Sequence, residues 1–215
     1  MKEIAIYGAG GFGREIACLI NIINQNKPTW KLIGFFDDNL TSKGKMIAHH
    51  GVCFGGIEEL ENWKKPLSIV IAIGNPKVII SVVSKINNPL IDFPNIIHPD
   101  FTIVDTQTFK IGKGNIIQGG CSVSCNVTFG NFNICNGSIA FGHDNYVGNY
   151  NVFMPAVRIS GEVTIGNENS FGVGSIILQQ ITIGNNVRLG AGSVMIYKPK
   201  NGKLYIGNPA AVFDI

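Results

Sequence analysis

The sequence has few charged residues and no long hydrophobic run, and each shortage excludes a class of function. Asp, Glu, Lys and Arg together make up 14% of the 215 residues, and the formal net charge is +3. No run of Lys or Arg forms the basic stripe typical of nucleic-acid binding, so we expect no nucleic-acid partner. The longest apolar runs, such as 68–73, fall far below the roughly 20 residues that a membrane span needs, so we expect no membrane insertion.

A secretion signal and a disulfide framework are also lacking. Residues 1–7 show no basic segment followed by an apolar block and a cleavage site. The cysteines are odd in number and irregularly spaced: Cys18, Cys53, Cys121, Cys125 and Cys135. We interpret them as reduced thiols that pack as small hydrophobic side chains, and Cys121 with Cys125 lacks a second ligand pair for zinc. We therefore expect a cytoplasmic protein without a metal.

The first half of the chain alternates between strand and helix patterns. The apolar spacing predicts strands at 3–7, 30–36 and 68–73, helices at 11–25 and 78–86, and a strand or loop at 90–97. Such alternation favours a small parallel sheet with right-handed crossovers. We therefore predict a Rossmann-like α/β domain over residues 1–98.

The second half, residues 99–215, follows a period of six. Every sixth position from 111 is apolar: Ile111, Ile117, Val123, Phe129, Cys135, Phe141, Val147, Phe153, Ile159, Ile165, Phe171, Ile177, Ile183 and Leu189. A helix of period 3.6 would lose phase within a few such steps. Many of these residues are followed by glycine, which we interpret as a corner where the chain turns without a Cβ. The fixed period predicts a parallel β-helix.

This period resembles that of the hexapeptide-repeat acyltransferases, whose left-handed β-helix has a triangular coil of three hexads. The resemblance implies that residues eighteen apart stack in three inward columns. The columns are Ile111–Phe129–Val147–Ile165–Ile183, Ile117–Cys135–Phe153–Phe171–Leu189 and Val123–Phe141–Ile159–Ile177–Met195. With about 4.8 Å per coil, the prism should be roughly 20–25 Å tall.

A glycine-rich turn follows the first predicted strand and opens the first predicted helix. Residues 8–13 read Gly-Ala-Gly-Gly-Phe-Gly, a G-x-G-x-x-G pattern whose backbone N–H groups suit a phosphate. Asp37 and Asp38 end the second strand, where a dinucleotide-binding fold places the acid that binds the ribose. A nucleotide-linked ligand fits this half-sized domain better than NAD, and a purely structural turn is a third interpretation.

One histidine is placed for chemistry. His143 follows Gly142 inside the repeat, and Asp144 comes directly after it. An imidazole can take a proton from an attacking amine or hydroxyl near neutral pH, and a carboxylate can fix its tautomer. Asp144 could instead bond the turn. One coil on, Gly161 has no side chain, and we expect this to leave space beside the imidazole for an acyl group.

A narrower resemblance covers essentially the whole chain. The motifs are the glycine turn, G-F-F-D-D at 34–38, A-I-G-N at 72–75, I-I-H-P at 96–99 and N-x6-H-D at 136–144. Together with the prism, they are similar to those of bacterial sugar acyltransferases of the sialic acid O-acetyltransferase and UDP-4-amino-sugar N-acetyltransferase type. This resemblance implies a homotrimer that acetylates an amino or hydroxyl group of a sugar for surface glycans. Acetyl-CoA, the co-substrate, would lie between adjacent prisms, and the N-terminal domain would hold the acceptor.

The resemblance also assigns roles to individual positions. His143 corresponds to the general base and Asp144 to the acid that assists it, and Asn136 matches an asparagine near the acyl site. The positions that would contact the acceptor are Gly10, Gly11, Phe12, Asp37, Asp38 and Gly74. Those that would line the acetyl-CoA groove are Gly161, Val173 and Ala191.

Two positions depart from the N-acetyltransferase pattern. Phe12 and Val152 stand where those enzymes carry histidines. The acceptor, and the choice between an amino and a hydroxyl group, therefore stay open. So does a different class of function, a non-catalytic β-helix scaffold or a nucleotide- or NAD-binding protein.

Overall fold

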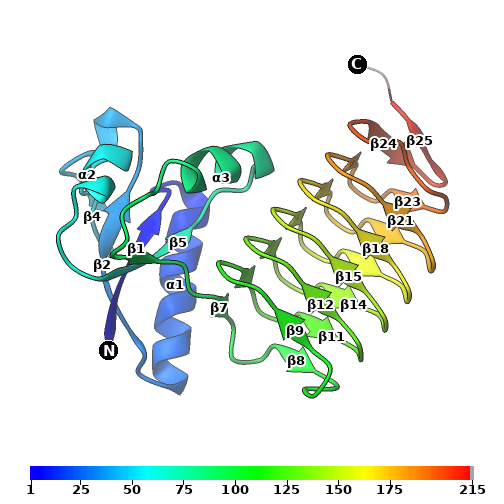
Figure 1. Cartoon of the computed structure of the whole chain (residues 1–215), viewed down its shortest axis with the longest axis horizontal. Coiled ribbons are helices and arrows are strands. Elements are labelled where there is room, and N and C mark those ends of the chain that lie inside the picture. Colours follow the sequence, from blue (N-terminus) through cyan, green and yellow to red (C-terminus); the bar gives the residue numbers. More distant parts are fainter. Residues whose placement is uncertain (214–215) are drawn as a thin grey trace. The chain divides into compact units, whose positions relative to one another are not determined.

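The computed structural model describes residues 1–213, and the chain divides into two compact units (Figure 1). Unit 1 is Met1–Pro99 and unit 2 is Asp100–Ile215. No helix in the described part of the chain is long and apolar enough to cross a bilayer.

Unit 1 is a parallel α/β domain, as predicted. Its elements are β1 (Lys2–Tyr7), α1 (Gly11–Asn26), β2 (Trp30–Phe36), the 3-10 turn η1 (Leu40–Ser42), β3 (Met46–Ile47), β4 (Gly51–Val52), α2 (Ile57–Glu61), β5 (Leu67–Ile71), α3 (Pro76–Val83), β6 (Ile91–Asp92) and β7 (Ile96–Ile97). The main sheet has the order β2-β1-β5-β6, and its strands pair in parallel. The carboxyl ends of β1, β2 and β5 therefore share one edge of this sheet.

The core of unit 1 lies between the sheet and α1. Ile4 and Ile6 of β1 are fully buried, and so are Ile16 and Ile20 on one face of the helix. The last helix differs from the predicted 78–86: it begins at Pro76, and Asn75 caps it by accepting a hydrogen bond from the backbone N–H of Lys77 at 3.0 Å. Proline at the first helical position and asparagine before it form a start signal that apolar spacing alone does not show.

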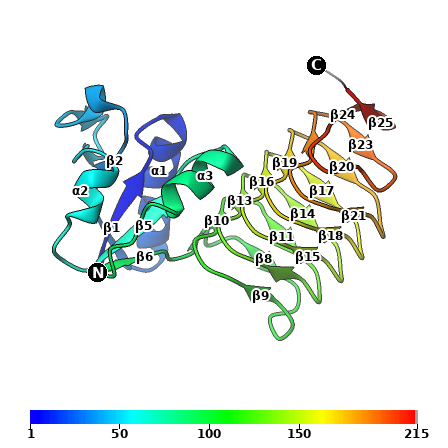
Figure 2. The ribbon, with the colours of Figure 1, turned by 45° about the horizontal axis from the view of Figure 1, so that its top comes forward.

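Unit 2 is a β-solenoid of about six coils with three flat faces (Figure 2). The first face contains β8 (Thr102–Ile103), β11 (Ser122–Val123), β14 (Ala140–Phe141), β17 (Arg158–Ile159), β20 (Ile176–Ile177) and β23 (Val194–Met195). The second contains β9 (Lys110–Ile111), β12 (Thr128–Phe129), β15 (Tyr146–Val147), β18 (Thr164–Ile165) and β21 (Thr182–Ile183). The third contains β10 (Ile116–Ile117), β13 (Ile134–Cys135), β16 (Val152–Phe153), β19 (Ser170–Phe171), β22 (Arg188–Leu189), β24 (Leu204–Gly207) and β25 (Ala210–Val212).

The register of these faces confirms the three predicted columns. Phe129 pairs with both Ile111 and Val147, and the other two columns repeat the same step. Most of the inward side chains are buried, with Phe153 and Phe171 stacked at a centroid distance of 4.8 Å. At the far end, β24 and β25 form an antiparallel pair that closes the last coil.

The corners correct our interpretation of the repeat glycines. The left-handed backbone conformation falls on the third residue after each inward residue, as at Asn126 (φ 56), Asp144 (φ 57) and Gly174 (φ 65). The glycine directly after the inward residue is not in this left-handed conformation. Glycine is needed there because a side chain would collide with the next coil. A Cβ on Gly148 would lie 2.5 Å from the carbonyl oxygen of Gly166. These glycines let adjacent coils approach, while the turn itself is made two residues later.

The corner between the second and third faces, here called the ladder corner, carries two stacks of asparagines that were not predicted. Asn115, Asn133, Asn151 and Asn169 form a buried stack in which each residue bonds the one before it. Asn151, for example, donates from Nδ2 to Asn133 Oδ1 at 3.0 Å and to the Gly166 carbonyl at 2.9 Å. Its own Oδ1 accepts from the backbone and side chain of Asn169. All the hydrogen-bonding capacity of this buried amide is used.

Candidate active site

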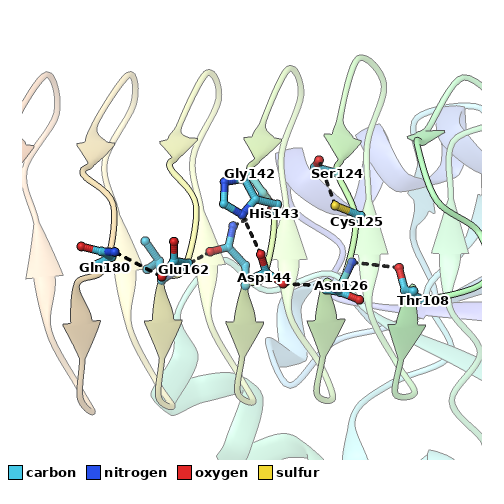
Figure 3. Close-up of polar contacts among 11 residues, drawn as sticks. Thr108, Ser124, Cys125, Asn126, Gly142, His143, Asp144, Glu162 and Gln180 are labelled. Carbon is cyan, nitrogen blue, oxygen red and sulfur yellow. Dashed lines mark hydrogen bonds and ion pairs between the residues drawn. The ribbon is translucent and has the colours of Figure 1, made fainter.

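His143 and Asp144 lie at the corner between the first and second faces, here called the dyad corner (Figure 3). His143 Nδ1 lies 2.7 Å from Asp144 Oδ2. The two side chains are about half exposed, at 52% and 47%. The alternative in which Asp144 turns away to bond the corner is therefore not the arrangement observed.

The environment of Asp144 defines the tautomer of the histidine. The hydrogen bond from His143 and a second one from Asn126 hold the pKa of the Asp144 carboxyl below its ordinary value. The carboxylate is then ionised near neutral pH and can only accept hydrogen bonds. The shared proton therefore lies on Nδ1, and Nε2 of the neutral imidazole carries a lone pair that can accept a proton.

Gly161 stacks one coil after His143, but the space beside it is not open, so that expectation was wrong. A Cβ on Gly161 would lie 2.5 Å from His143 Nε2 and 2.7 Å from its Cε1. The imidazole itself fills the place that a side chain would occupy. The role that the structure gives Gly161 is to admit the ring against the backbone of the next coil.

Asn126 and Cys125, one coil before the dyad, are the other neighbours of Asp144. Asn126 Nδ2 donates to Asp144 Oδ1 at 2.9 Å, a contact that sequence reasoning missed although the eighteen-residue register places it there. The carbonyl of Cys125 accepts from the Asp144 backbone N–H at 2.9 Å, and its thiol lies 3.9 Å from Ser124 Oγ. Among residues 1–213, the Cys125 thiol forms no hydrogen bond with His143.

The remaining predicted residues of unit 2 lie at the third corner, between the third and first faces. Asn136 donates to the Phe153 carbonyl at 3.1 Å and accepts from Gln118 Nε2 at 2.9 Å, and no hydrogen bond in the described chain joins it to His143. Val173 and Ala191 stack one coil apart, and Val173 is 48% exposed. Within one chain, the predicted cofactor residues are thus divided between two corners, because Gly161 lies at the dyad corner.

In unit 1, the predicted acceptor residues gather at the carboxyl edge of the sheet. Gly8 has a φ of +113° and Gly13 packs against the Gly8 carbonyl, so the fold itself requires both glycines. Gly10 and Gly74 differ, because a Cβ on either would meet nothing within 4 Å. Neither backbone strain nor packing explains these two exposed glycines, which is what a surface approached by a ligand would show. Phe12 lies beside them, half-buried in the first turn of α1.

Asp37 and Asp38 use most of their oxygens inside the domain. Asp37 accepts from the backbone N–H of Ala9 at 2.7 Å and of Asn39 at 2.8 Å. Asp38 Oδ1 accepts from the buried Tyr7 hydroxyl at 2.6 Å and from the Ile57 N–H at 3.0 Å. Burial and this bond to Asp38 raise the pKa of Tyr7, so the phenol stays a donor. Asp37 holds the glycine turn through its bond from Ala9. Of the four carboxylate oxygens of Asp37 and Asp38, only Asp38 Oδ2 has no hydrogen-bond partner among the described residues.

No group of three or more His, Cys, Asp and Glu side chains in the described residues is arranged to hold a metal ion. Val152, which stands where the resembling enzymes have a second histidine, is a buried residue of β16. The site of unit 2 therefore depends on the dyad, the backbone around Gly161 and Asn126.

Comparisons with known proteins agree with the fold. Residues 3–86 match the family described as the PglD N-terminal domain. The chain resembles, over its full length, sugar acetyltransferases built on a hexapeptide β-helix, which confirms the resemblance drawn from the motifs. No match was found among curated protein sequences.

Three solved structures illustrate the likeness. The acetyltransferase domain of PglB from Neisseria gonorrhoeae, in complex with acetyl coenzyme A, is 26% identical, with 99% of each chain covered and a TM-score of 0.86. WeeI from Acinetobacter baumannii is 24% identical, over 99% of this chain and 100% of that one, with a TM-score of 0.87. A mutant of perosamine N-acetyltransferase from Caulobacter crescentus, in complex with CoA and GDP-perosamine, is 20% identical, over 100% and 98%, with a TM-score of 0.84.

Proposed function

We propose that this protein transfers the acetyl group of acetyl-CoA to an amino or hydroxyl group of a nucleotide-linked sugar, with His143 as general base. The observation that carries the proposal is the dyad: an imidazole with its Nδ1 fixed by an ionised carboxylate and its Nε2 available as a base. The cytoplasm, where acetyl-CoA is available, is the expected compartment, and surface glycan synthesis is the expected use.

The reaction proceeds in one direct attack. The acceptor nitrogen or oxygen forms a bond to the thioester carbonyl carbon, and His143 Nε2 takes the proton that the acceptor loses. A backbone N–H stabilises the oxyanion. The carbon–sulfur bond then breaks, and His143 Nε2 gives up that proton to the leaving sulfur, so that CoA departs as the thiol. No acyl-enzyme is required, because the nearby thiol of Cys125 makes its described side-chain contact with Ser124 and not with the base.

The acceptor would bind at the carboxyl edge of the sheet in unit 1. The open surface at Gly10, Gly11 and Gly74 supports this, because a ligand backbone or phosphate can approach closely where side chains are missing. Asp38 Oδ2 is the group we expect to bond the nucleotide. Phe12 would contribute an apolar contact next to this surface, and Asn136 would lie near the acyl group.

Acetyl-CoA would lie in a groove shared by two copies in a homotrimer. Gly161 lies at the dyad corner, whereas Val173 and Ala191 lie at the third corner, so a groove lined by all three needs a second prism. The first face supplies apolar side chains for such contact: Ile176, Leu178 and Ile196 are 36%, 41% and 47% exposed. Closed symmetry is the usual result of such self-association. Light scattering at micromolar concentration should give roughly 70 kDa, three times 23.2 kDa, and a monomer would contradict the shared groove.

A thiol-release assay tests the activity. The protein is incubated with acetyl-CoA and a panel of nucleotide sugars that includes matched amino and hydroxyl forms, and the acetylated product is identified by mass spectrometry. Release of CoA that depends on one acceptor supports the proposal and shows whether nitrogen or oxygen is acetylated. Absence of release with every acceptor, together with tight binding of a nucleotide or NAD, would favour the non-catalytic class.

A further inference from the structure

Asn126 stands one coil before Asp144, at the same corner and in the same left-handed backbone conformation. We propose that Asn126 is a positioning residue, whose side-chain amide fixes the Asp144 carboxylate in the orientation that holds His143. This inference rests on the proposed function and adds to it a residue that does not touch the reacting atoms.

The hydrogen bonds at Asp144 show why a second contact matters. Oδ2 is bonded to His143 Nδ1 at 2.7 Å, and Oδ1 accepts from Asn126 Nδ2 at 2.9 Å. A carboxylate bonded at one oxygen can still rotate about its side-chain torsion, and water competes for it because Asp144 is 47% exposed. Bonding both oxygens removes that rotation, so the imidazole is held at one angle.

Asn126 is itself anchored from the coil before it. Its backbone N–H donates to Thr108 Oγ1 at 2.8 Å, and the Thr108 hydroxyl donates to Asp105 Oδ2 at 2.8 Å. Figure 3 shows Thr108, Asn126 and Asp144 in line along the corner, joined by hydrogen bonds. The anchor begins at the first coil and ends at the dyad.

The following coils offer Asp144 no replacement donor. Glu162 occupies the same place one coil later, and a second carboxylate cannot donate to the first when both are ionised. Glu162 instead accepts from Gln180 Nε2 at 3.2 Å. Along this corner the side chains are thus an amide, two acids and a second amide: Asn126, Asp144, Glu162 and Gln180. Each acid accepts from the amide next to it and not from the other acid. For Asp144 that donor is Asn126.

A structural role for Asn126 makes a different prediction, and glycine separates the two. Asparagine tolerates the left-handed conformation, so Asn126 could be present for its backbone alone. Asn126→Gly keeps that conformation without strain and removes the amide. Asn126→Asp keeps the shape of the side chain and replaces the donor with a carboxylate facing Asp144.

The experiment measures steady-state kinetics and the imidazole N–H resonance of the full-length protein. We expect Asn126→Gly to lower kcat about tenfold, as small errors in the placement of catalytic groups do, with the KM of both substrates unchanged. Asn126→Asp should lose more. The downfield proton of His143 Nδ1, assigned by its absence in His143→Ala, should broaden in both variants. Asn186→Gly is the matched control, because Asn186 has a φ of 54° at the ladder corner, and its kcat and spectrum should not change.

An unchanged kcat and a sharp proton resonance in Asn126→Gly would overturn the inference, as would full activity of Asn126→Asp. Failure of the proposed function looks different, because the unaltered protein would then transfer no acetyl group. The proton resonance would still report whether Asn126 holds the dyad.

Discussion

The dyad corner and the ladder corner are built on the same backbone and use it differently. At the ladder corner, buried asparagines recur in four successive coils and bond one another and backbone carbonyls. At the dyad corner the residues change from coil to coil, and the His143 and Asp144 side chains are about half exposed. The difference teaches that in this solenoid a polar residue repeated from coil to coil supports the structure, whereas polar residues that occur once at a corner are the candidates for function.

The largest expected effect is at the dyad. His143→Ala should lower kcat by about 10²–10⁴, the usual contribution of a general base, with little change in acetyl-CoA affinity. Cys125→Ala, one coil before it, should stay active. Near-native turnover of His143→Ala, or an acetyl thioester trapped on Cys125, would show that the corner does not work by direct transfer.

The buried ladder should respond in stability instead of rate. Asn151→Ala leaves the Gly166 carbonyl without its partner, as well as the two Asn169 N–H groups that donate to Asn151 Oδ1. Asn133 Oδ1 keeps only its bond from the backbone N–H of residue 151. Each buried unsatisfied group costs about 1–3 kcal/mol, so the free energy of unfolding should fall by roughly 3 kcal/mol or more. Denaturant unfolding measures this loss. The control is the half-buried Asn149, which belongs to the second stack at this corner, Asn131–Asn149–Asn167–Asn185, and Asn149→Ala should cost less. If Asn151→Ala lowered kcat and left the free energy of unfolding unchanged, the proposed difference between the two corners would be wrong.

The same distinction can be tested on the two acids of unit 1. Asp38 has one oxygen outside the internal bonds, so Asp38→Ala should raise the KM of the acceptor about ten- to a hundredfold, which corresponds to a charged hydrogen bond of roughly 1.5–3 kcal/mol. Acetyl-CoA affinity should not change. Asp37 accepts from the Ala9 N–H of the glycine turn through one oxygen and from the Asn39 N–H through the other, so Asp37→Ala should lower stability as well. An acceptor KM that neither variant changes would place the acceptor elsewhere.

Two glycines of the repeat give the smallest and most selective test. At Gly161 an added Cβ meets the end of the His143 side chain, whereas at Gly148 it meets the backbone of the next coil. Gly161→Ala should displace the imidazole and lower kcat about tenfold with stability unchanged. Gly148→Ala should instead lower the free energy of unfolding by about 1–3 kcal/mol through overpacking. Thermal melts and kcat measurements on both variants test this difference. An equal loss of stability in Gly161→Ala and Gly148→Ala would contradict it.

Much of the fold could be predicted from the sequence, because a period of six that is always apolar leaves one way to bury its side chains. The columns through Phe129, Phe153 and Phe141 followed from that rule alone once the coil length was known. The ladder was not predicted although G-N-x-N recurs at 130–133, 148–151 and 166–169, because this repeat is polar and apolar periodicity does not contain it. The bond from Asn126 to Asp144 depends on side-chain rotamers, which sequence spacing does not determine.

The glycines that follow many of the inward residues were recognised, but the structural reason for them was not predicted. Its role depends on the distance between successive coils, which a one-dimensional pattern does not contain. The same holds for Gly161, whose missing side chain we interpreted as space for a ligand. The imidazole of His143 fills that space, because a flexible neighbouring side chain takes any room that the backbone leaves.

The coil length has a consequence for insertions. A duplicated segment of eighteen residues would only translate everything after it along the prism, by about 4.8 Å. A duplicated hexad would also keep an apolar residue in every inward position, so the core would accept it. Yet it would move each later residue to the next face, and Val173 would then leave the third corner. In this architecture an insertion of six residues preserves the core but not the site, whereas an insertion of eighteen residues preserves both. The site can therefore be lost while the core is kept.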